Sequence, residues 1–457
     1  MTVTYHHPSL IFTYYCVIPH PEGGRILLVK NGDGLSLPHF QPEEHHFGVV
    51  DHINVALAEK HNLNVAVLRC LGDEYVQDGV HRYYALDNLS TQIEVGEGLQ
   101  WAYLNELPDM PVPKNQRAMV ARWHEWQHQK DERRSPWSQA GWYTEASTVL
   151  TDFADRMDMV PTGRVEQVRA WARSSVLRIP TEKGYLFLKA VPTMFAYETK
   201  LTRIFSLRYP PHIPQVLAVN GERSWMLIDG FKGELLSQIK DVAIWERSLK
   251  RYARLQMDLD KSARALMNMG VPDRNIDALA SQVEKLAADL PAELNEDEQD
   301  LFRRSVRLLR SLCYELMDYQ IPLTLLHGDF WPGNIIVRED NQEPIFFDWS
   351  DSAVSHPFFD LPFFLDDIEE MLPGVPDVRR RLRDAYLSQW TRYEPAGRLR
   401  RLYQIARVVG PLHYALTYHA YVLPGMSPSV RWEMSAMLPL MVRKVLAEHE
   451  HYQKAEQ

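Results

Sequence analysis

Cysteine is scarce in this sequence, whose three cysteines, Cys16, Cys70 and Cys313, lie far apart. Their spacing provides neither a disulfide framework nor a set of metal ligands, and it is typical of proteins in a reducing compartment. No apolar run approaches the ~18 residues that a membrane span requires. The first residues lack the pattern of a signal peptide. These absences predict a cytoplasmic protein without a membrane-spanning segment.

An excess of positive charge is also missing. The formal net charge is -10 over 457 residues, which argues against nucleic acid or an anionic membrane as the partner. The sequence shows no low-complexity segment and no internal repeat. A mixed composition at this length predicts a globular protein of two or three domains, and it indicates no particular oligomeric state.

Residues 1–127 have the pattern of an α+β domain. Runs rich in Tyr, Val, Ile and Leu predict strands, and two segments of helical periodicity predict helices. The strands are expected within 11–20, 25–30, 65–76 and 81–88, and the helices within 49–63 and 115–127. The charged stretch 128–136 ends in proline and predicts a linker.

The remainder of the chain divides into a mixed part and a helical part. In 137–230 the patterns predict a helix, consecutive antiparallel strands, a second helix and two further strands. These elements are expected within 141–159, 164–181, 184–191, 195–209, 215–220 and 224–231. Region 231–457 is mostly of helical periodicity.

The stretch LLHGDFWPGNIIV, residues 325–337, interrupts the predicted helices. His327, Asp329 and Asn334 fit the form H-x-D-x-x-x-x-N of a phosphoryl-transfer loop. The aspartate of such a loop orients the attacking hydroxyl or accepts its proton, and the asparagine carbonyl is an oxygen ligand for Mg²⁺. Two short strands joined by a polar turn would return Asp348 to the side of Asn334, and two converging oxygen ligands suit a hard cation.

The alternative for this stretch is a polar turn in which His327 and Asp329 only satisfy backbone groups. The position of Asp348 after a predicted second strand makes this alternative the weaker one. Upstream, Lys189 interrupts an apolar strand and Glu198 follows nine residues later on a predicted helix. Such a pair matches the strand lysine and helix glutamate of kinases. Taken alone, Lys189 would better fit an edge-strand lysine that extends to water; its position upstream of the H-x-D-x-x-x-x-N motif favours the kinase role.

These residues resemble the aminoglycoside phosphotransferase and choline kinase family, which is protein-kinase-like. The resemblance extends from about residue 136 to the end of the chain. It implies a bilobal fold with a β-rich N-lobe and a helical C-lobe, and a kinase that uses ATP and Mg²⁺ to phosphorylate a small-molecule hydroxyl. On the family pattern, Asp329 is the catalytic aspartate, and Asn334 and Asp348 are the magnesium ligands.

The resemblance also assigns the nucleotide site. Lys189 is expected to contact the α- and β-phosphates, and Glu198 to fix this lysine. The segment MLIDGFKG resembles the hinge between lobes, so the backbone of Ile228 and Gly230 is expected to bind adenine. Asp360 matches a second acidic position of the family, for which we expect a structural role.

One segment departs from the family pattern. The loop that covers the nucleotide is expected within 168–179, which contains no glycine. Glycines let a backbone approach phosphates closely. In their absence, the hydroxyls of Ser174 and Ser175 are the expected donors to the phosphates.

The N-terminal region resembles a Nudix fold, with a strand, the turn LSLP and a helix. A Nudix helix binds Mg²⁺ through a cluster of glutamates, but window 55–60 reads VALAEK and retains only Glu59. We therefore expect a catalytically inactive Nudix-like domain in 1–127. The nearby His39, His45, His46 and His52 suit a metal site less well than solvated loops, because no acidic or cysteine partner recurs at a fixed spacing.

The phosphate acceptor is expected to meet residues downstream of the catalytic loop. Asp366 and Asp367, with Glu369 and Glu370, are predicted on one helix, where they would form an acidic wall for a cationic amine or a solvated face. Tyr414 and Tyr418 recur at helical spacing and would either face the acceptor or pack within the helix bundle.

Three functions compete for this sequence. The leading hypothesis is a small-molecule kinase. The second is a sensor or pseudokinase that binds a nucleotide or metabolite without transferring phosphate, which the glycine-free loop keeps open. The third, a Nudix hydrolase, is disfavoured by the missing glutamates.

Overall fold

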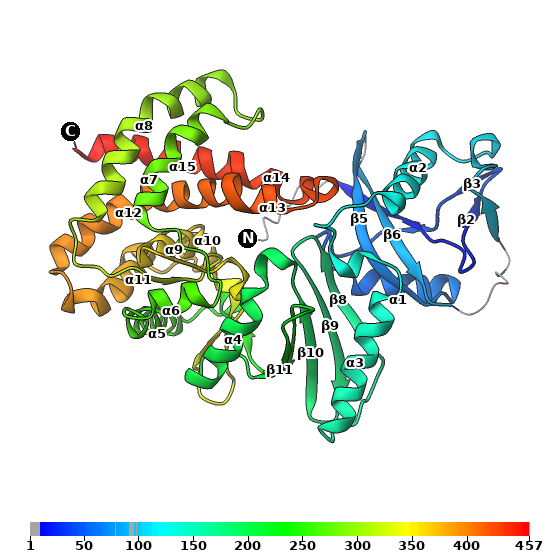
Figure 1. Cartoon of the computed structure of the whole chain (residues 1–457), viewed down its shortest axis with the longest axis horizontal. Helices are drawn as coiled ribbons and strands as arrows, with labels where there is room; N and C mark the ends of the chain where they lie inside the picture. The colour runs from blue at the N-terminus through cyan, green and yellow to red at the C-terminus, as the bar shows by residue number, and fades with distance from the viewer. Residues whose placement is uncertain (1–9, 78, 91–95, 97, 457) are drawn as a thin grey trace. The chain divides into compact units, whose positions relative to one another are not determined.

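The structure is a computed structural model that describes residues 10–77, 79–90, 96 and 98–456. These residues form two compact units. The N-terminal unit contains the described part of Thr2–Pro192 together with Trp225–Ile228, and the C-terminal unit contains Thr193–Ser224 and the chain from Asp229 onward. Strands dominate the first unit and helices the second (Figure 1). The expected α+β class, with a β-rich part followed by a helical part, is confirmed.

The first part of the N-terminal unit holds two small sheets. Their strands are β1 (Ile11–Val17), β2 (Arg25–Asn31), β3 (Gly34–Ser36), β4 (His39–Phe40), β5 (Val65–Val76), β6 (Gly79–Asn88) and β7 (Leu99–Tyr103). One sheet has the order β4-β1-β6-β5 and the other the order β3-β2-β7. β1 runs parallel to β6, whereas β5 and β6 form an antiparallel pair. The four predicted strands are confirmed, and β3, β4 and β7 are additional to them.

Two helices accompany these sheets, α1 (Asp51–His61) and α2 (Lys114–His128), as the periodicity predicts. On α2, Val120 and Trp123 lie one turn apart and are buried. They belong to the same core cluster as Leu28 of β2 and Tyr83 of β6. Helix α2 therefore joins the two sheets through one apolar face.

A third sheet of the N-terminal unit has the order β12-β10-β9-β8. Its strands are β8 (Glu166–Trp171), β9 (Ser174–Thr181), β10 (Gly184–Ala190) and β12 (Trp225–Asp229). β8, β9 and β10 pair antiparallel in chain order, as predicted. Helix α3 (Trp142–Arg156) runs along this sheet and contacts β9 and β10 (Figure 1). Its buried residues Trp142, Ala146 and Leu150 recur at the four-residue spacing that places them on one face.

Residues just before α1 and a residue of β5 bind the edge strand β8. Val49 forms an antiparallel bridge with Arg169, and the amide of Ala170 donates to the Gly48 carbonyl at 2.9 Å. The side chain of Gln167 donates to the Val67 carbonyl at 2.8 Å and accepts from the Val67 amide at 2.7 Å. Residues on both sides of 128–136 therefore belong to one compact unit, and the domain boundaries at 127 and 137 stay a prediction.

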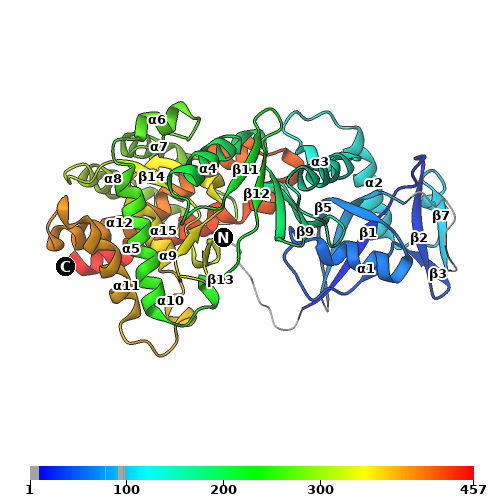
Figure 2. The same ribbon diagram turned by 90° about the horizontal axis from the view of Figure 1, so that it is seen from below.

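The C-terminal unit consists mainly of helices. They are α4 (Tyr197–Arg208), α5 (Val242–Asp258), α6 (Ala263–Asn268), α7 (Ile276–Ala288), α8 (Glu296–Leu316), α9 (Asp360–Phe364), α10 (Ile368–Met371), α11 (Val378–Leu387), α12 (Ala396–Thr417), α13 (Leu423–Gly425), α14 (Trp432–Ser435) and α15 (Met437–Glu456). α7 packs on α8 and α12 on α15 (Figure 1), while α5 packs on α11 (Figure 2). No helix in the described part of the chain is long and apolar enough to cross a membrane.

Short strands also occur in this unit, most of them around the predicted catalytic loop. They are β11 (Val216–Asn220), β13 (Glu234–Leu235), β14 (Thr324–Leu326), β15 (Ile335–Val337), β16 (Pro344–Phe346) and β17 (Ala353–Ser355). β15 and β16 form the predicted antiparallel hairpin, which β13 extends to three strands. β14 pairs with β17, which brings the two ends of the segment between these strands together.

One predicted helix is wrong. Asp366 and Asp367 do not share a helix with Glu369 and Glu370, because α9 ends at Phe364 and α10 begins only at Ile368. Asp367 has a positive φ of 53°, in the left-handed region that ends a right-handed helix. The four acidic side chains therefore do not line one helical face.

Candidate active site

The catalytic loop begins at the end of β14, where Asp360 anchors its first two amides. The backbone N–H groups of His327 and Gly328 donate to Asp360 at 2.9 Å and 3.2 Å. Tyr414 also donates to this carboxylate, at 3.0 Å, and Tyr252 does so as well. Burial raises the pKa of Asp360 above its usual value, although these donors oppose the shift. Asp360 thus has the structural role that was expected of it.

Gly328 lets the chain turn sharply beside this anchor. Its φ is +80°, which residues with a side chain adopt at a cost. A Cβ atom at this position would lie 2.0 Å from the carbonyl oxygen of Asp351. Only glycine fits here, so the segments that carry Asp329 and Asp351 can approach each other.

The side chains of Asp329 and Asn334 contact each other directly. Asn334 Nδ2 donates to Asp329 Oδ2 at 3.0 Å and to the Asp329 carbonyl at 2.9 Å. With its nitrogen turned toward Asp329, the amide of Asn334 presents Oδ1 as its remaining polar atom. A neutral amide oxygen of this kind is a suitable ligand for Mg²⁺.

Phe347 connects the loop to the strand that carries Asp348. Its amide donates to the Asn334 carbonyl at 3.2 Å, and its carbonyl accepts from His327 Nε2 at 2.9 Å. Because a carbonyl only accepts, His327 carries its proton on Nε2. Both backbone groups of Phe347 are thus bound to the catalytic loop. His327 therefore positions the residue just before Asp348, a role that the spacing of the motif did not reveal.

Asp348 itself has a left-handed backbone, with φ 66° and ψ 67°. The hydroxyl of Ser350 donates to Asp348 Oδ1 at 2.9 Å. The hairpin register pairs Ile335 with Phe346, so Asn334 and Phe347 are the next residues on the two strands. The structure therefore brings together Asp329, Asn334 and the strand end that carries Asp348, as the sequence predicted.

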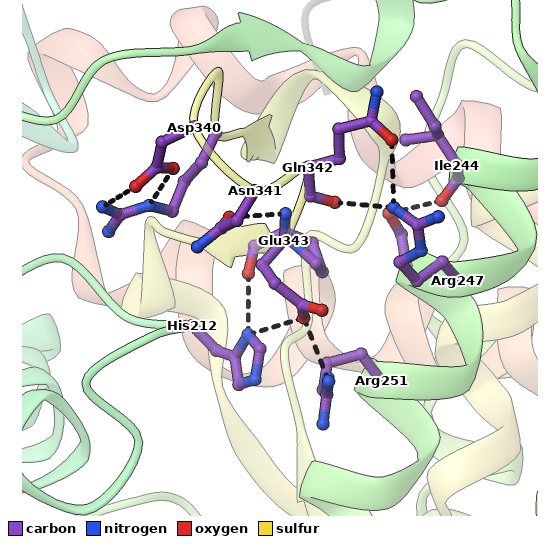
Figure 3. Close-up of polar contacts among 11 residues, drawn as sticks. His212, Ile244, Arg247, Arg251, Asp340, Asn341, Gln342 and Glu343 are labelled. Carbon is purple, nitrogen blue, oxygen red and sulfur yellow. Dashed lines mark hydrogen bonds and ion pairs between the residues drawn. The ribbon is translucent and has the colours of Figure 1, made fainter.

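The turn of this hairpin is fixed to α5 and to His212 (Figure 3). Arg251 of α5 donates to Glu343 Oε2 at 3.0 Å, and Arg247, one helical turn earlier, donates to a carbonyl of the same turn at 3.2 Å. His212 Nδ1 donates to the Pro344 carbonyl at 3.0 Å. These contacts fix where β16 begins. Because β16 is short and Asp348 follows it by two residues, they also help to fix the position of Asp348.

A small pocket that opens to solvent lies beside Asp329. Apolar and aromatic side chains form most of its wall, and Asp329 and Asp351 supply the carboxylates. The lining residues are Gly328, Asp329, Phe330, Trp331, Asp351, Phe363, Tyr414, Tyr418, Met437 and Met441. Two predicted acceptor residues, Tyr414 and Tyr418, are among them.

The predicted acidic acceptor residues lie outside this lining. Asp366 forms an ion pair with Lys444, and burial raises its pKa. Asp367 is exposed. Glu369 forms an ion pair with Arg379 at 2.6 Å. Basic side chains therefore neutralise much of the acidic segment.

The predicted nucleotide residues fall in both units. Lys189 is buried in β10 of the N-terminal unit, paired in register with Val176. Glu198 is fully buried in the first turn of α4, in the C-terminal unit. Tyr197 ties α4 to the segment after Asp348, because its hydroxyl contacts the Ser350 carbonyl at 2.6 Å. The pairing of Lys189 with Glu198 stays a prediction.

The two serines of the glycine-free loop lie at the start of β9. Ser175 is fully buried, and its hydroxyl donates to the Arg169 carbonyl at 3.1 Å. Ser174 Oγ accepts a hydrogen bond from Trp171 Nε1 at 2.9 Å. The hydroxyl of Ser175 is thus used within the hairpin, which leaves Ser174 as the better placed of the two expected phosphate donors.

The segment expected to be the hinge lies where the chain leaves the N-terminal unit and enters the C-terminal unit. β12 ends at Asp229, and the division between the two compact units falls between Ile228 and Asp229. Gly230 follows in irregular backbone. A role of Ile228 and Gly230 in adenine binding stays a prediction.

The histidines of the N-terminal unit do not gather at one point. Among the described residues, no group of three or more His, Cys, Asp or Glu side chains is arranged to hold a metal ion. His39 Nδ1 contacts the Leu37 carbonyl at 3.0 Å, and His46 Nδ1 accepts from the Gly48 amide at 3.0 Å. Both rings support local backbone.

The sequence matches the model of the phosphotransferase enzyme family over residues 164–399, slightly more than half of the chain. This match includes Lys189, Asp329, Asn334 and Asp348. It begins after the N-terminal sheets, so it says nothing of the resemblance to Nudix proteins. No curated protein matches the sequence.

Several solved structures share a distant likeness. An aminoglycoside 2'-phosphotransferase IIIa in complex with GDP is 15% identical, with a TM-score of 0.46, and covers 68% of this chain and 98% of its own. Choline kinase from Cryptosporidium parvum Iowa II is 13% identical, with a TM-score of 0.47 and coverages of 68% and 97%. Macrolide 2'-phosphotransferase from Brachybacterium faecium is 17% identical, with a TM-score of 0.43 and coverages of 66% and 98%. With TM-scores below 0.5, these likenesses add nothing to the family match.

Proposed function

This chain belongs to the phosphotransferase enzyme family, whose members transfer phosphate to hydroxyl groups, and we propose that it is a cytoplasmic kinase that uses ATP and Mg²⁺ to phosphorylate a small molecule. The observation that carries the proposal is the bonded arrangement of Asp329, Asn334 and Phe347. It supports a catalytic carboxylate and two metal-binding oxygens on one rigid hairpin.

Asp329 orients the acceptor hydroxyl, or accepts its proton, as the hydroxyl attacks the γ-phosphate. Its carboxylate lines the pocket and is itself oriented by Asn334 Nδ2. An orienting hydrogen bond of this kind keeps a catalytic group in its reactive position. Positioning and electrostatic stabilisation supply most of the rate in phosphoryl transfer.

Asn334 Oδ1 and the Asp348 carboxylate would hold Mg²⁺. Their chemistry fits the metal, because a neutral amide oxygen and a carboxylate are both hard ligands. When bound, the ion supplies positive charge against the phosphate oxygens. His327 and Ser350 keep these ligands in place through Phe347 and Asp348.

The nucleotide would bind through the N-terminal sheet. Lys189 contacts the α- and β-phosphates, and Glu198 holds this lysine in position. Ser174 donates to the phosphates, and the backbone of Ile228 and Gly230 binds adenine. The family match, which includes all of these residues, supports this part of the proposal.

The proposal is tested by measuring ATP consumption with Mg²⁺ over a panel of alcohols, sugars, aminoglycosides and nucleosides. Asp348→Asn removes one negative ligand, so the Mg²⁺ concentration at half-maximal activity should rise about tenfold or more. Asp340→Asn is the matched control, because Asp340 is exposed in the turn of the same hairpin and pairs with Arg338. Equal Mg²⁺ dependence of the two variants would contradict the proposed metal site.

A sensor that binds a nucleotide without transferring phosphate is the second candidate. The buried, internally bonded Ser175 favours it, because this loop has lost one expected phosphate donor. Tight Mg·ATP binding without turnover of any acceptor would support the sensor.

For residues 1–127 we propose a Nudix-like domain without hydrolase activity. The mixed sheet that combines parallel and antiparallel strands supports a fold of this type. Glu59 is exposed on α1 and is the only glutamate of the window. The domain should therefore not cleave nucleoside diphosphate derivatives in the presence of Mg²⁺.

A further inference from the structure

The pocket beside Asp329 has an apolar wall built from three separate elements of the C-terminal unit. Phe363 comes from α9, Tyr414 from α12, and Met437 and Met441 from the first turns of α15. The rings of Phe363 and Tyr414 are packed with centroids 4.0 Å apart. Met441 is fully buried, and the other three side chains are exposed by 8% or less. This wall is part of a folded core that continues to the pocket surface.

The helix type changes at Tyr418, which also lines the pocket. α12 ends at Thr417, and a π-helical turn covers Tyr418–Val422. Such turns are rare and occur frequently at functional sites. Tyr418 follows Tyr414 by four residues, so the two side chains lie on the same side of the helix and both line the pocket.

The charges that line the pocket are all negative. Asp329 and Asp351 are its only ionisable acids, and no Lys, Arg or His is among its lining residues. The pKa of Tyr414 is well above its usual value, because the ring is buried and lies near the carboxylates of Asp360, Asp329 and Asp351. The pocket therefore disfavours an acceptor that is itself an anion, such as a phosphorylated sugar.

One of the predicted acidic acceptor residues, Asp366, is already paired with a basic side chain. Lys444, one turn beyond Met441 on α15, forms an ion pair with Asp366 and lies 5.2 Å from the ring centroid of Phe363. Lys444 is not among the pocket-lining residues. Beyond Asp329 and Asp351, no carboxylate is among the pocket-lining residues, so the several amines of a polycationic acceptor would find few partners there.

We propose that the acceptor is a hydroxyl compound with an apolar body that carries no negative charge, and that Tyr418 and Met437 set this preference. The inference rests on the proposed kinase function and deepens it. The hydroxyl lies at Asp329 while the body of the molecule packs on the apolar wall. Methionine side chains adapt to irregular apolar shapes, so the wall accepts a class of alcohols rather than one ring.

The test compares acceptors by kcat/KM with saturating Mg·ATP. The probes are benzyl alcohol and cyclohexylmethanol as apolar alcohols, glucose as a neutral polyol, glucose 6-phosphate as an anion and kanamycin as a polycation. The apolar alcohols should exceed each of the other three by about tenfold or more. A higher value for kanamycin, glucose or glucose 6-phosphate overturns the inference, but it leaves the kinase function intact. The absence of transfer to every probe overturns the inference, and Mg·ATP turnover over the wider panel then decides the kinase function.

Two variants test whether the apolar wall causes the preference for apolar alcohols. Met437→Gln places an amide in the pocket lining and should raise KM for the apolar alcohols about fivefold or more, with KM for Mg·ATP unchanged. Met434→Gln is the matched control, because Met434 of α14 is as buried, at 6% exposure against 8%, and does not line the pocket. Thermal unfolding of both variants measures any shared loss of stability. Equal KM values in the two variants overturn the assignment.

Discussion

The catalytic hairpin of the C-terminal unit and the segment 46–61 of the N-terminal unit use similar local structure for different purposes. Each contains a turn between an extended segment and the next element, and each was selected from the sequence by resemblance to a metal-binding motif. In the hairpin, the polar groups of His327, Asp329 and Asn334 are bonded to one another and to the end of β16. In segment 46–61, backbone groups bind the edge strand β8 instead.

The second segment forms an interface with strand β8. The carbonyl of Gly48 accepts from the Ala170 amide, and the amide of Val50 donates to the Val168 carbonyl at 3.3 Å. A Cβ atom on Gly48 would lie 3.1 Å from the side chain of Trp171. The turn thus serves to dock on β8. A motif predicts chemistry only where its polar atoms remain directed toward a common point, as in the hairpin.

Two glycines with similar backbone dihedral angles, one in each unit, are expected to show the largest difference. The difference is in the free energy of unfolding lost when each is replaced by alanine. Gly328→Ala puts a Cβ 2.0 Å from a backbone oxygen, whereas Gly141→Ala, at φ +85°, meets no atom within 4 Å. Gly328→Ala should lower the free energy of unfolding by about 3 kcal/mol or more, against about 1 kcal/mol for Gly141→Ala. Urea unfolding measures both values. Equal losses would show that the catalytic loop is not closely packed at Gly328.

The next effect concerns the docking of β8. Gln167→Met keeps the length of the side chain but leaves both backbone groups of Val67 without their partner. Since Gln167 is 1% exposed, the free energy of unfolding should fall by about 2 kcal/mol. The exposed Gln129→Met is the control and should change it by less than about 0.5 kcal/mol. A neutral Gln167→Met would mean that β8 does not depend on this contact.

The smallest effect is a pH dependence within segment 46–61. Burial, helped by the positive charge of Arg169, lowers the pKa of His46 to about 4, although Glu44 opposes the shift. The unfolded chain binds this proton near pH 6.5 and the folded chain only near pH 4, so stability falls as the pH drops through this window. For this partly exposed ring the loss should be about 1 to 2 kcal/mol.

The variant His46→Asn separates this titration from the rest of the protein. Its side-chain oxygen can accept from the Gly48 amide as Nδ1 does, but it does not titrate. Unfolding measured between pH 6.5 and 4 should therefore fall less steeply for the variant than for the wild type. Identical slopes would assign the acid sensitivity to other groups.

Periodicity predicted many of the helices and strands, and motif spacing predicted that Asp329, Asn334 and Asp348 would lie together. The helices α2, α3 and α4 and the strands β8 to β10 followed from residue patterns, and Asp348 followed from its place after a second strand. Strands β13, β14 and β17 have only two or three residues, too few to show a period. The anchoring of Asp360 by Tyr252 and Tyr414 joins distant parts of the chain, which no local pattern encodes.

The wrong helix at Asp366 and Asp367 has a similar origin. Charged residues at helical spacing predicted one continuous helix, but the left-handed backbone at Asp367 divides it. The ion pair of Asp366 with Lys444 spans 78 residues and was equally hidden from local patterns. Acidic spacing alone therefore did not identify an acceptor site.

Phosphate transfer by Asp329→Asn, compared with Glu59→Gln, tests the central claim most directly. Both changes replace a carboxylate by an amide, one in the predicted catalytic loop and one on the exposed side of helix α1. With Mg·ATP and an accepted alcohol, Asp329→Asn should lower kcat by about 10²- to 10⁴-fold, and Glu59→Gln should leave it unchanged, with both proteins folded. An Asp329→Asn protein as active as the wild type would contradict the account.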